Sequence, residues 1–246
     1  MDIRNLAIKG IFFDAGDTLF EAQETIGETY SRLALQYGLR CDAAVLNGRF
    51  RAAFKVSPPM AFGKVSDKER LRLERQWWEQ VVQSVFEGIN FPEFEAFFQA
   101  LYRYFGVGPA WRLFPETKAV VAALKSEGYT LGIISNFDSR LPAICKDLGL
   151  WDAFDLVLFS SREGFAKPSP EIFEAALERC GLSPSEAIHI GDHALNDVGG
   201  AERVGMTGIL VDRSKRDAGG ESSIPFGGHR ITDLWGVADF LQNPSL

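Results

Sequence analysis

Short apolar runs alternate with helical segments over the second half of the sequence, and this alternation constrains the fold more than any other feature. Runs rich in strand-forming residues predict strands over 130–135, 156–160, 187–190 and 207–211. The segments around them predict helices over 116–127, 138–149, 170–180, 195–204 and 232–242. Strands separated by helices of this length form right-handed crossovers and a parallel sheet. The predicted fold class is therefore α/β.

One further apolar run lies far upstream, at 8–13, and an acidic turn follows it directly. From 22 to 108 the character of the sequence changes, because apolar residues recur there at helical spacing and no strand pattern interrupts them. In the segment 68–89, the charged residues are predicted to lie opposite an apolar face made by Leu71, Trp78, Val81, Val82 and Val85. We therefore predict an all-helical unit inserted after the first strand.

This insertion divides the chain into two predicted domains. The core domain would comprise residues 1–21 and 109–246, and the helical domain would comprise residues 22–108. An insertion after the first strand starts at the carboxyl end of that strand, which is where open α/β sheets bind their ligands. The helical unit is therefore predicted to form a cap over a binding site.

Composition argues against several classes of protein. The 246 residues are 46% hydrophobic and 24% charged, as in ordinary globular proteins, and the formal net charge of -7 argues against a general nucleic-acid binder. No stretch approaches the roughly 18–20 apolar residues of a membrane span, and the charged N-terminal run is unlike a secretory signal. The three cysteines lack metal-binding spacing and fit a reducing compartment. We expect a soluble, cytoplasmic monomer or homodimer without membrane or nucleic-acid partners.

Polar residues follow the predicted strands at the points where these strands end. Asp14 follows the first strand, Ser135 and Asn136 end the second, and Asp192 and Asp197 follow the fourth. Because neighbouring parallel strands bring their carboxyl ends together, we expect these groups to converge. Carboxylates gathered at one edge repel one another and raise one another's pKa. A bound divalent cation is the simplest way to offset this repulsion, and oxygen ligands select a hard cation such as Mg²⁺.

A lysine completes the predicted site. Lys167 precedes Pro168, which favours an extended or turn conformation and allows the lysine amine to point into the cleft. Carboxylates with a hard cation, a lysine and a serine hydroxyl suit a phosphoryl group, because the cations neutralise its oxygens and the remaining donors bind them. An ionised aspartate is then a competent nucleophile, and water can cleave the aspartyl-phosphate that it forms.

Taken in order, these segments resemble the haloacid dehalogenase superfamily of hydrolases. The sequence DAGDT at 14–18 corresponds to the first motif of that family, DxDx(T/V), and Ser135 corresponds to the second, a Ser or Thr that ends a hydrophobic strand. Lys167 in a KPxPxxF context corresponds to the third motif, and GDHALND at 191–197 corresponds to the fourth. The insertion lies where one subfamily carries a helical cap, between motifs one and two.

The resemblance implies a Rossmann-like parallel sheet with helices on both faces, an inserted helical cap, and Mg²⁺ as the cofactor. Asp14 would be the catalytic nucleophile and a metal ligand. The metal site would also comprise Asp192, Asp197 and the backbone carbonyl of Gly16. These assignments follow from the family motifs and not from the spacing of the residues.

The same resemblance implies side chains that bind the phosphoryl group. Ser135, Asn136 and Thr18 would contact the transferring group, and Lys167 would bind it while steadying Asp14. Ser135 and Lys167 would therefore act in catalysis together with Asp14. The substrate implied is a phosphorylated small molecule.

Gly16 departs from the family pattern, because the phosphatases of the family carry a second aspartate at this place. That aspartate protonates the leaving group and then activates water, which contributes about 10²–10⁴ to the rate. The protein is therefore a phosphatase that needs good leaving groups or borrows an acid, a hydrolase of C–P or other C–X bonds, or a weakly active or non-catalytic protein that binds metal and phosphate.

Two observations bear on the alternatives. Family dehalogenases lose the acidic fourth motif along with the metal, so the retention of Asp192 and Asp197 argues against dehalogenation. Cleavage of a C–P bond would need a lysine of the cap as a Schiff base, and the available residues are Lys55, Lys64 and Lys68.

Two histidines lie near the fourth motif. His189, in the predicted strand 187–190, is expected to pack in the core rather than to bind a ligand. His193 follows Asp192 and is expected near the cleft without a direct part in catalysis.

Overall fold

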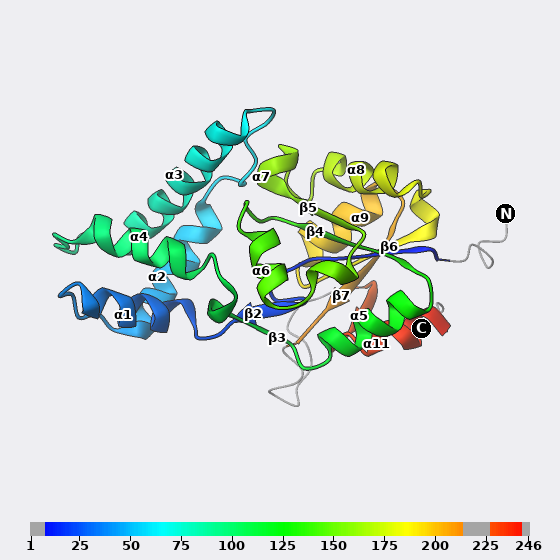
Figure 1. The fold of residues 1–246 in the computed structure, drawn as a ribbon, viewed down its shortest axis with the longest axis horizontal. Helices are drawn as coiled ribbons and strands as arrows, with labels where there is room; N and C mark the ends of the chain where they lie inside the picture. The colour runs from blue at the N-terminus through cyan, green and yellow to red at the C-terminus, as the bar shows by residue number, and fades with distance from the viewer. Residues whose placement is uncertain (1–7, 214–226, 243–246) are drawn as a thin grey trace.

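The computed structural model describes residues 8–213 and 227–242, and within these ranges a six-stranded sheet forms the centre of the protein (Figure 1). The strand order is β5-β4-β1-β6-β7-β8, and every neighbouring pair runs parallel. The strands are β1 (Gly10–Phe13), β4 (Thr130–Ser135), β5 (Leu156–Phe159), β6 (Ala187–Gly191), β7 (Thr207–Val211) and β8 (His229–Ile231). Because β1 lies between β4 and β6, the segments that follow these strands meet at one edge of the sheet.

Helices cover both faces of this sheet. Successive strand residues point to opposite faces, so each face presents apolar side chains that helices bury. Within the described ranges, the α-helices in chain order are α1 (Ile26–Gln36), α2 (Ala43–Val56), α3 (Asp67–Val85), α4 (Phe94–Tyr104), α5 (Thr117–Ser126), α6 (Leu141–Asp147), α7 (Ser160–Glu163), α8 (Pro170–Cys180), α9 (Gly200–Arg203) and α11 (Gly236–Gln242). Ile11 and Phe13 pack with residues of α5, α6 and α11, whereas Phe12 packs with residues of α8 and α9. The predicted α/β class, with a Rossmann-like parallel sheet, is confirmed.

Helices α1 to α4 form a separate helical insert between β1 and the later strands (Figure 1). The insert has its own core, in which Tyr30, Leu46, Val82 and Phe97 are each at most 2% exposed. Its helices begin where the sequence supplies capping groups: Thr25, Asp42 and Ser66 each accept a hydrogen bond from the backbone N–H three residues on. The prediction of an all-helical insertion is therefore confirmed.

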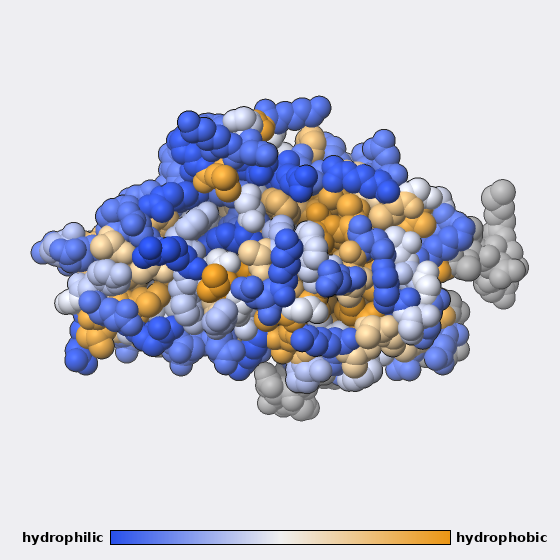
Figure 2. Space-filling view, viewed as in Figure 1, coloured by the Kyte–Doolittle hydropathy of each residue, from blue (hydrophilic) through white to orange (hydrophobic). Residues whose placement is uncertain are grey.

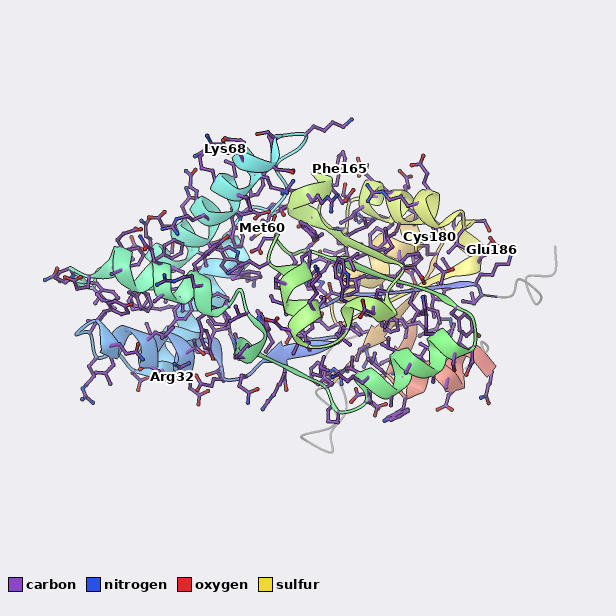
Figure 3. The ribbon with its side chains drawn as sticks, in the orientation of Figure 1. Arg32, Met60, Lys68, Phe165, Cys180 and Glu186 are labelled. Carbon is purple, nitrogen blue, oxygen red and sulfur yellow. The ribbon has the colours of Figure 1, made fainter. Side chains whose placement is uncertain are left out.

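The insert faces the core across a short boundary. Met60 of the insert and Phe165 of the core both lie beside this boundary, whereas Arg32 lies on the part of the insert away from the sheet (Figure 3). The hydroxyl of Ser160 donates a hydrogen bond to the Met60 carbonyl at 2.7 Å. On the face drawn in Figure 2, hydrophilic side chains cover most of the insert, and apolar side chains show over the core around β4 and β5. Among the described helices, none has both the length and the hydropathy needed to cross a bilayer.

Several details differ from the sequence predictions. A short antiparallel pair, β2 (Phe20–Ala22) and β3 (Trp111–Leu113), joins the insert to the core, and strands of three residues are too short to show a period. β8 precedes α11, so the last helix begins at Gly236 instead of residue 232. The helix expected over 195–204 begins as a π-helix, Ala194–Gly199.

The apolar face predicted for α3 is partly wrong. Leu71 is 51% exposed, whereas Glu74 is fully buried. Glu74 is hydrogen-bonded to the core, and a carboxylate with such partners can be buried where helical periodicity would place a charge in solvent. Residues 1–7, 214–226 and 243–246, which the predicted core domain includes, lie outside the described ranges.

Candidate active site

The segments predicted to converge do so at the carboxyl edge of the sheet. Asp14 follows β1 directly, and its backbone N–H donates to the Ile190 carbonyl of the neighbouring strand β6 at 2.8 Å. Ser135 ends β4, is 2% exposed, and favours the ionised form of Asp14 by lowering its pKa. Asp192 follows β6. The order β4-β1-β6 thus brings three of the predicted motifs together.

Lys167 lies at the centre of this group and is only 4% exposed. Its Nζ donates to Asp14 Oδ1 at 2.6 Å and to Asp197 Oδ1 at 2.5 Å. Burial alone would lower the pKa of Lys167, but the charges of Asp14 and Asp197 outweigh it and raise the pKa above its ordinary value. The side chain is therefore an ammonium group held between two carboxylates.

Asn136 fixes the backbone of Lys167. Its side-chain amide donates to the Lys167 carbonyl at 2.9 Å and accepts from the Lys167 N–H at 2.7 Å. This paired contact positions the lysine loop against the end of β4. The predicted contact between Asn136 and the transferring group stays a prediction.

Asp197 is held from several sides. Its Oδ2 accepts a hydrogen bond from the His193 backbone N–H at 2.9 Å, and His189 Nε2 lies 3.2 Å from its Oδ1. Gly191 makes this approach possible, because a Cβ at that position would lie 2.2 Å from the Asp197 Cγ. Burial would raise the pKa of Asp197, but Lys167 and His189 hold it below its ordinary range. The contact with His189 was not predicted, because a histidine within an apolar strand gives no sign of its partner.

The carboxylates of Asp14, Asp192 and Asp197 offer ligand atoms that all lie within 4.8 Å of one another. Burial, followed by the charges of Asp14 and Asp197, raises the pKa of Asp192 to about 8. Within the described residues, the Asp192 carboxylate has no hydrogen-bond partner. An unpaired acid beside two others fits a hard divalent cation such as Mg²⁺, which would stabilise the ionised form of each.

The acidic turn after β1 contains the remaining predicted residues. A Cβ on Gly16 would meet nothing within 4 Å, so the space beside this residue is open. Thr18 is fully buried, and its Oγ1 has no partner among the described residues, while its carbonyl accepts from Arg213 at 2.7 Å. Asp17 adopts a left-handed backbone conformation with φ of 57°, which aspartate tolerates better than most residues.

A cavity of about 520 Å³ opens beside these residues. Its lining includes Asp17 and Asp192 of the site together with Arg112 and Phe114 after the insert and Arg213 after β7. A volume of this size is typical of small-molecule sites.

Comparison with known proteins agrees with the geometry. The profile of haloacid dehalogenase-like hydrolases matches residues 8–205. The chain belongs to this family. It is 33% identical over 209 residues to human haloacid dehalogenase-like hydrolase domain-containing protein 3, covering 84% of this chain and 82% of the relative. The resemblance drawn from the motifs is therefore confirmed.

Solved structures of the family share the fold of this chain over its length. A phosphatase of the family from Thermococcus onnurineus superposes with a TM-score of 0.64 at 25% identity, covering 95% of this chain and 98% of the other. A 2-haloacid dehalogenase from Pseudomonas syringae pv. Tomato superposes with the same TM-score at 26% identity, covering 97% and 100%. Because a phosphatase and a dehalogenase resemble the chain equally, the site and not the fold has to decide the chemistry.

Proposed function

We propose that the protein is a Mg²⁺-dependent phosphatase that hydrolyses a phosphorylated small molecule through an aspartyl-phosphate on Asp14. The observation that supports this most is the Lys167 ammonium held between Asp14 and Asp197, with Asp192 unpaired beside them. The Asp14 carboxylate alone would repel an anionic substrate. The buried Lys167 ammonium and a metal cation bound at the same carboxylate would stabilise that substrate. The proposal includes a cytoplasmic location and a cap formed by residues 22–108.

In the first half of the reaction, Asp14 attacks phosphorus while Lys167 keeps its carboxylate in one orientation. The bond from the Asp14 oxygen to phosphorus forms, and the bond from phosphorus to the leaving-group oxygen breaks. The leaving oxygen takes a proton from solvent, because Gly16 carries no acid. Bound at Asp14, Asp192, Asp197 and the Gly16 carbonyl, Mg²⁺ would neutralise charge on the phosphoryl oxygens.

In the second half, water attacks the phosphorus of the aspartyl-phosphate. The bond between phosphorus and the Asp14 oxygen breaks, phosphate leaves, and a proton returns to solvent. Ser135 binds a phosphoryl oxygen through its hydroxyl in both halves, and Lys167 supplies positive charge to the same group. Asp14 is regenerated as a carboxylate beside Lys167.

The missing acid predicts which substrates react. A leaving group that departs without a proton does not need the general acid, so aryl and acyl phosphates should react much faster than alkyl phosphates, by about 10²-fold or more. A panel of phosphate esters of graded leaving-group pKa measures this directly. Equal rates across the panel would show that another acid reaches the leaving group.

Trapping of the nucleophile, taken together with the ester panel, separates an enzyme from a protein that only binds its ligand. Beryllofluoride with Mg²⁺ should form a stable adduct on Asp14 that fluorine NMR detects, and Asp14→Asn should not form it. If the wild-type protein forms the adduct but turns over none of the esters, the second candidate function holds: a protein that binds metal and phosphorylated ligands. Gly16 is the observation that favours this second candidate.

Cleavage of C–P bonds receives no support from the described insert. The lysines available for a Schiff base, Lys55, Lys64 and Lys68, are all exposed to solvent. A lysine that acts as a Schiff base in a closed site needs a desolvated amine.

A further inference from the structure

His189 is a buried imidazole to which the reaction proposed above gives no role. Its side chain is fully buried in β6, and its ring meets Phe173 of α8 edge-on, with 5.2 Å between the ring centroids. Its Nδ1 has no hydrogen-bond partner within the described residues. Burying an imidazole with one unpaired nitrogen is unfavourable compared with an apolar side chain of similar size. Packing alone therefore does not explain a histidine here.

The other ring nitrogen leads to the nucleophile. His189 Nε2 lies 3.2 Å from Asp197 Oδ1, the same oxygen that accepts from Lys167 Nζ at 2.5 Å. Lys167 in turn donates to Asp14 Oδ1 at 2.6 Å. A carboxylate can only accept hydrogen bonds, so the contact places a proton on Nε2. The chain of contacts from His189 to Asp14 thus runs through two charged side chains.

The consequence of this contact follows from the geometry of Asp197. The backbone N–H of His193 holds its Oδ2 at 2.9 Å, while His189 and Lys167 share its Oδ1. Without the imidazole donor, Lys167 would be the remaining side-chain donor to Oδ1 among the described residues, and the carboxylate could rotate about its bond to Cβ. The ammonium would then follow it away from Asp14.

We infer that His189 is a positioning residue, whose Nε2–H fixes Asp197 and thereby holds the Lys167 ammonium against Asp14. The effect on turnover rests on the proposed function. The effect on Lys167 does not, because it is a property of the folded protein without substrate.

Three variants at this position separate the donor from the packing. His189→Gln places an amide nitrogen the same number of bonds from Cβ as the imidazole Nε2, so it can keep the donor. His189→Leu fills much of the volume without a donor, and His189→Asn carries a donor that is too short to reach Asp197. Ile188→Val is a matched control, since Ile188 lies in the same strand and packs on the opposite face of the sheet.

The first measurement is the rate at which an acylating reagent modifies Lys167, followed by peptide mass spectrometry. We expect the rate to rise about tenfold or more in His189→Leu and His189→Asn, because a lost hydrogen bond to a charged group changes an equilibrium by about that factor. His189→Gln should stay close to the wild type, and so should Ile188→Val. The acylation rate of the exposed Lys125 is the internal control for differences in reagent concentration between samples.

The second measurement is the kinetics with an aryl phosphate. We expect kcat to fall about tenfold or more in His189→Leu with KM nearly unchanged, and His189→Gln to restore most of kcat. A loss shared equally by His189→Gln and His189→Leu, or a Lys167 acylation rate equal in all variants, would overturn the inference. If no ester is turned over but acylation follows the expected order, the positioning role stands and the proposed phosphatase fails. If His189→Leu does not fold, His189→Asn against His189→Gln gives the same comparison.

Discussion

Buried carboxylates occur in two regions of the molecule, and their partners differ. The sheet-edge cluster (Asp14, Lys167, Asp192 and Asp197) is built by the core alone. The seam cluster (Glu74, Trp78, Asp138, Ser139 and Arg140) joins α3 of the insert to the segment after β4. In both, a cation lies against a buried acid, with Lys167 on Asp197 at 2.5 Å and Arg140 on Asp138 at 2.6 Å.

Asp138 is a fully paired acid. Its Oδ2 accepts from Arg140 and from the indole N–H of Trp78, both at 2.6 Å. The Arg140 guanidinium also lies over the rings of Trp78 and Tyr102. Burial alone would raise the pKa of Asp138, but Arg140 and the hydrogen bonds hold it below its ordinary range. This acid stays ionised as part of a stable contact between insert and core.

Glu74 is only half satisfied. Its Oε1 accepts from the Ser139 hydroxyl at 2.8 Å and from the Ser161 hydroxyl at 2.5 Å, while its Oε2 has no partner within the described residues. Burial raises the pKa of Glu74 in spite of these hydrogen bonds.

The difference between the clusters shows how to distinguish a site from a structural contact. In the sheet-edge cluster the unpaired acid, Asp192, borders a cavity and lies within ligand distance of two other acids. In the seam cluster each acid accepts a hydrogen bond from the other part of the molecule, Asp138 from Trp78 and Glu74 from Ser139, and neither acid lines that cavity. An acid without a hydrogen-bond partner beside a cavity favours the binding of a ligand, whereas acids that accept hydrogen bonds across the boundary hold the insert and the core together. Variants in the two clusters should therefore change different properties.

The largest effect is expected for Asp14→Asn. Turnover of an aryl phosphate should fall on the order of 10⁴-fold or more, because the nucleophile is lost. The unfolding free energy, from urea titration, should stay within about 1 kcal/mol of the wild type, because Lys167 keeps Asp197 as a partner. A large loss of stability without a loss of turnover would reverse the comparison.

Asp138→Ala should show the opposite pattern. Removing it leaves the Arg140 guanidinium without its buried partner, and breaking such a pair costs about 3–5 kcal/mol of unfolding free energy. Trp78→Phe is the milder control, because it removes one hydrogen bond and should cost about 1–3 kcal/mol. Beryllofluoride should still bind to the folded fraction of both variants. Wild-type stability in Asp138→Ala would mean that the seam contact contributes nothing.

Gly16→Asp adds an acid to the sheet-edge cluster. A side chain fits there without a clash, because the Cβ position is open and the backbone of Gly16 is not left-handed. We expect alkyl-phosphate turnover to rise by about tenfold or more, with little change for aryl phosphates. Gly16→Asn has nearly the same shape without the acid and should give no increase. Equal rates for the two variants would show that the missing acid does not limit the reaction.

Glu74→Gln should give the smallest effect, in the pH dependence of stability. The raised pKa means that folded wild-type protein binds this proton more tightly than the unfolded chain, in which glutamate titrates near about 4.3. Wild-type stability relative to Glu74→Gln should therefore fall as pH rises from about 4.3 to the raised pKa, and then stay constant. Paired thermal melts across that range measure it. If the stability of the wild type relative to Glu74→Gln rose with pH, this would contradict the raised pKa.

Much of the site could be predicted from the sequence, because several of its residues directly follow or end strands that the sequence pattern reveals. Asp14, Ser135 and Asp192 each follow an apolar strand, and parallel strands bring such ends to one edge whatever the rest of the chain does. The order of these strands in the sheet could not be derived from their spacing, and only the structure supplied it. The prediction that Lys167 belongs to the same group rested on the proline that follows it and on the family motif.

The sequence by itself determined the α/β class, the helical insert and the acidic edge of the sheet, since each depends on periodicity or on the residue that follows a strand. Only the tertiary structure decided that Glu74 is buried, that Leu71 is exposed, and that His189 contacts Asp197. These outcomes depend on which donors another element brings to a side chain. Periodicity records the direction in which a side chain points, but the free energy of burying it is set by the partner it meets there.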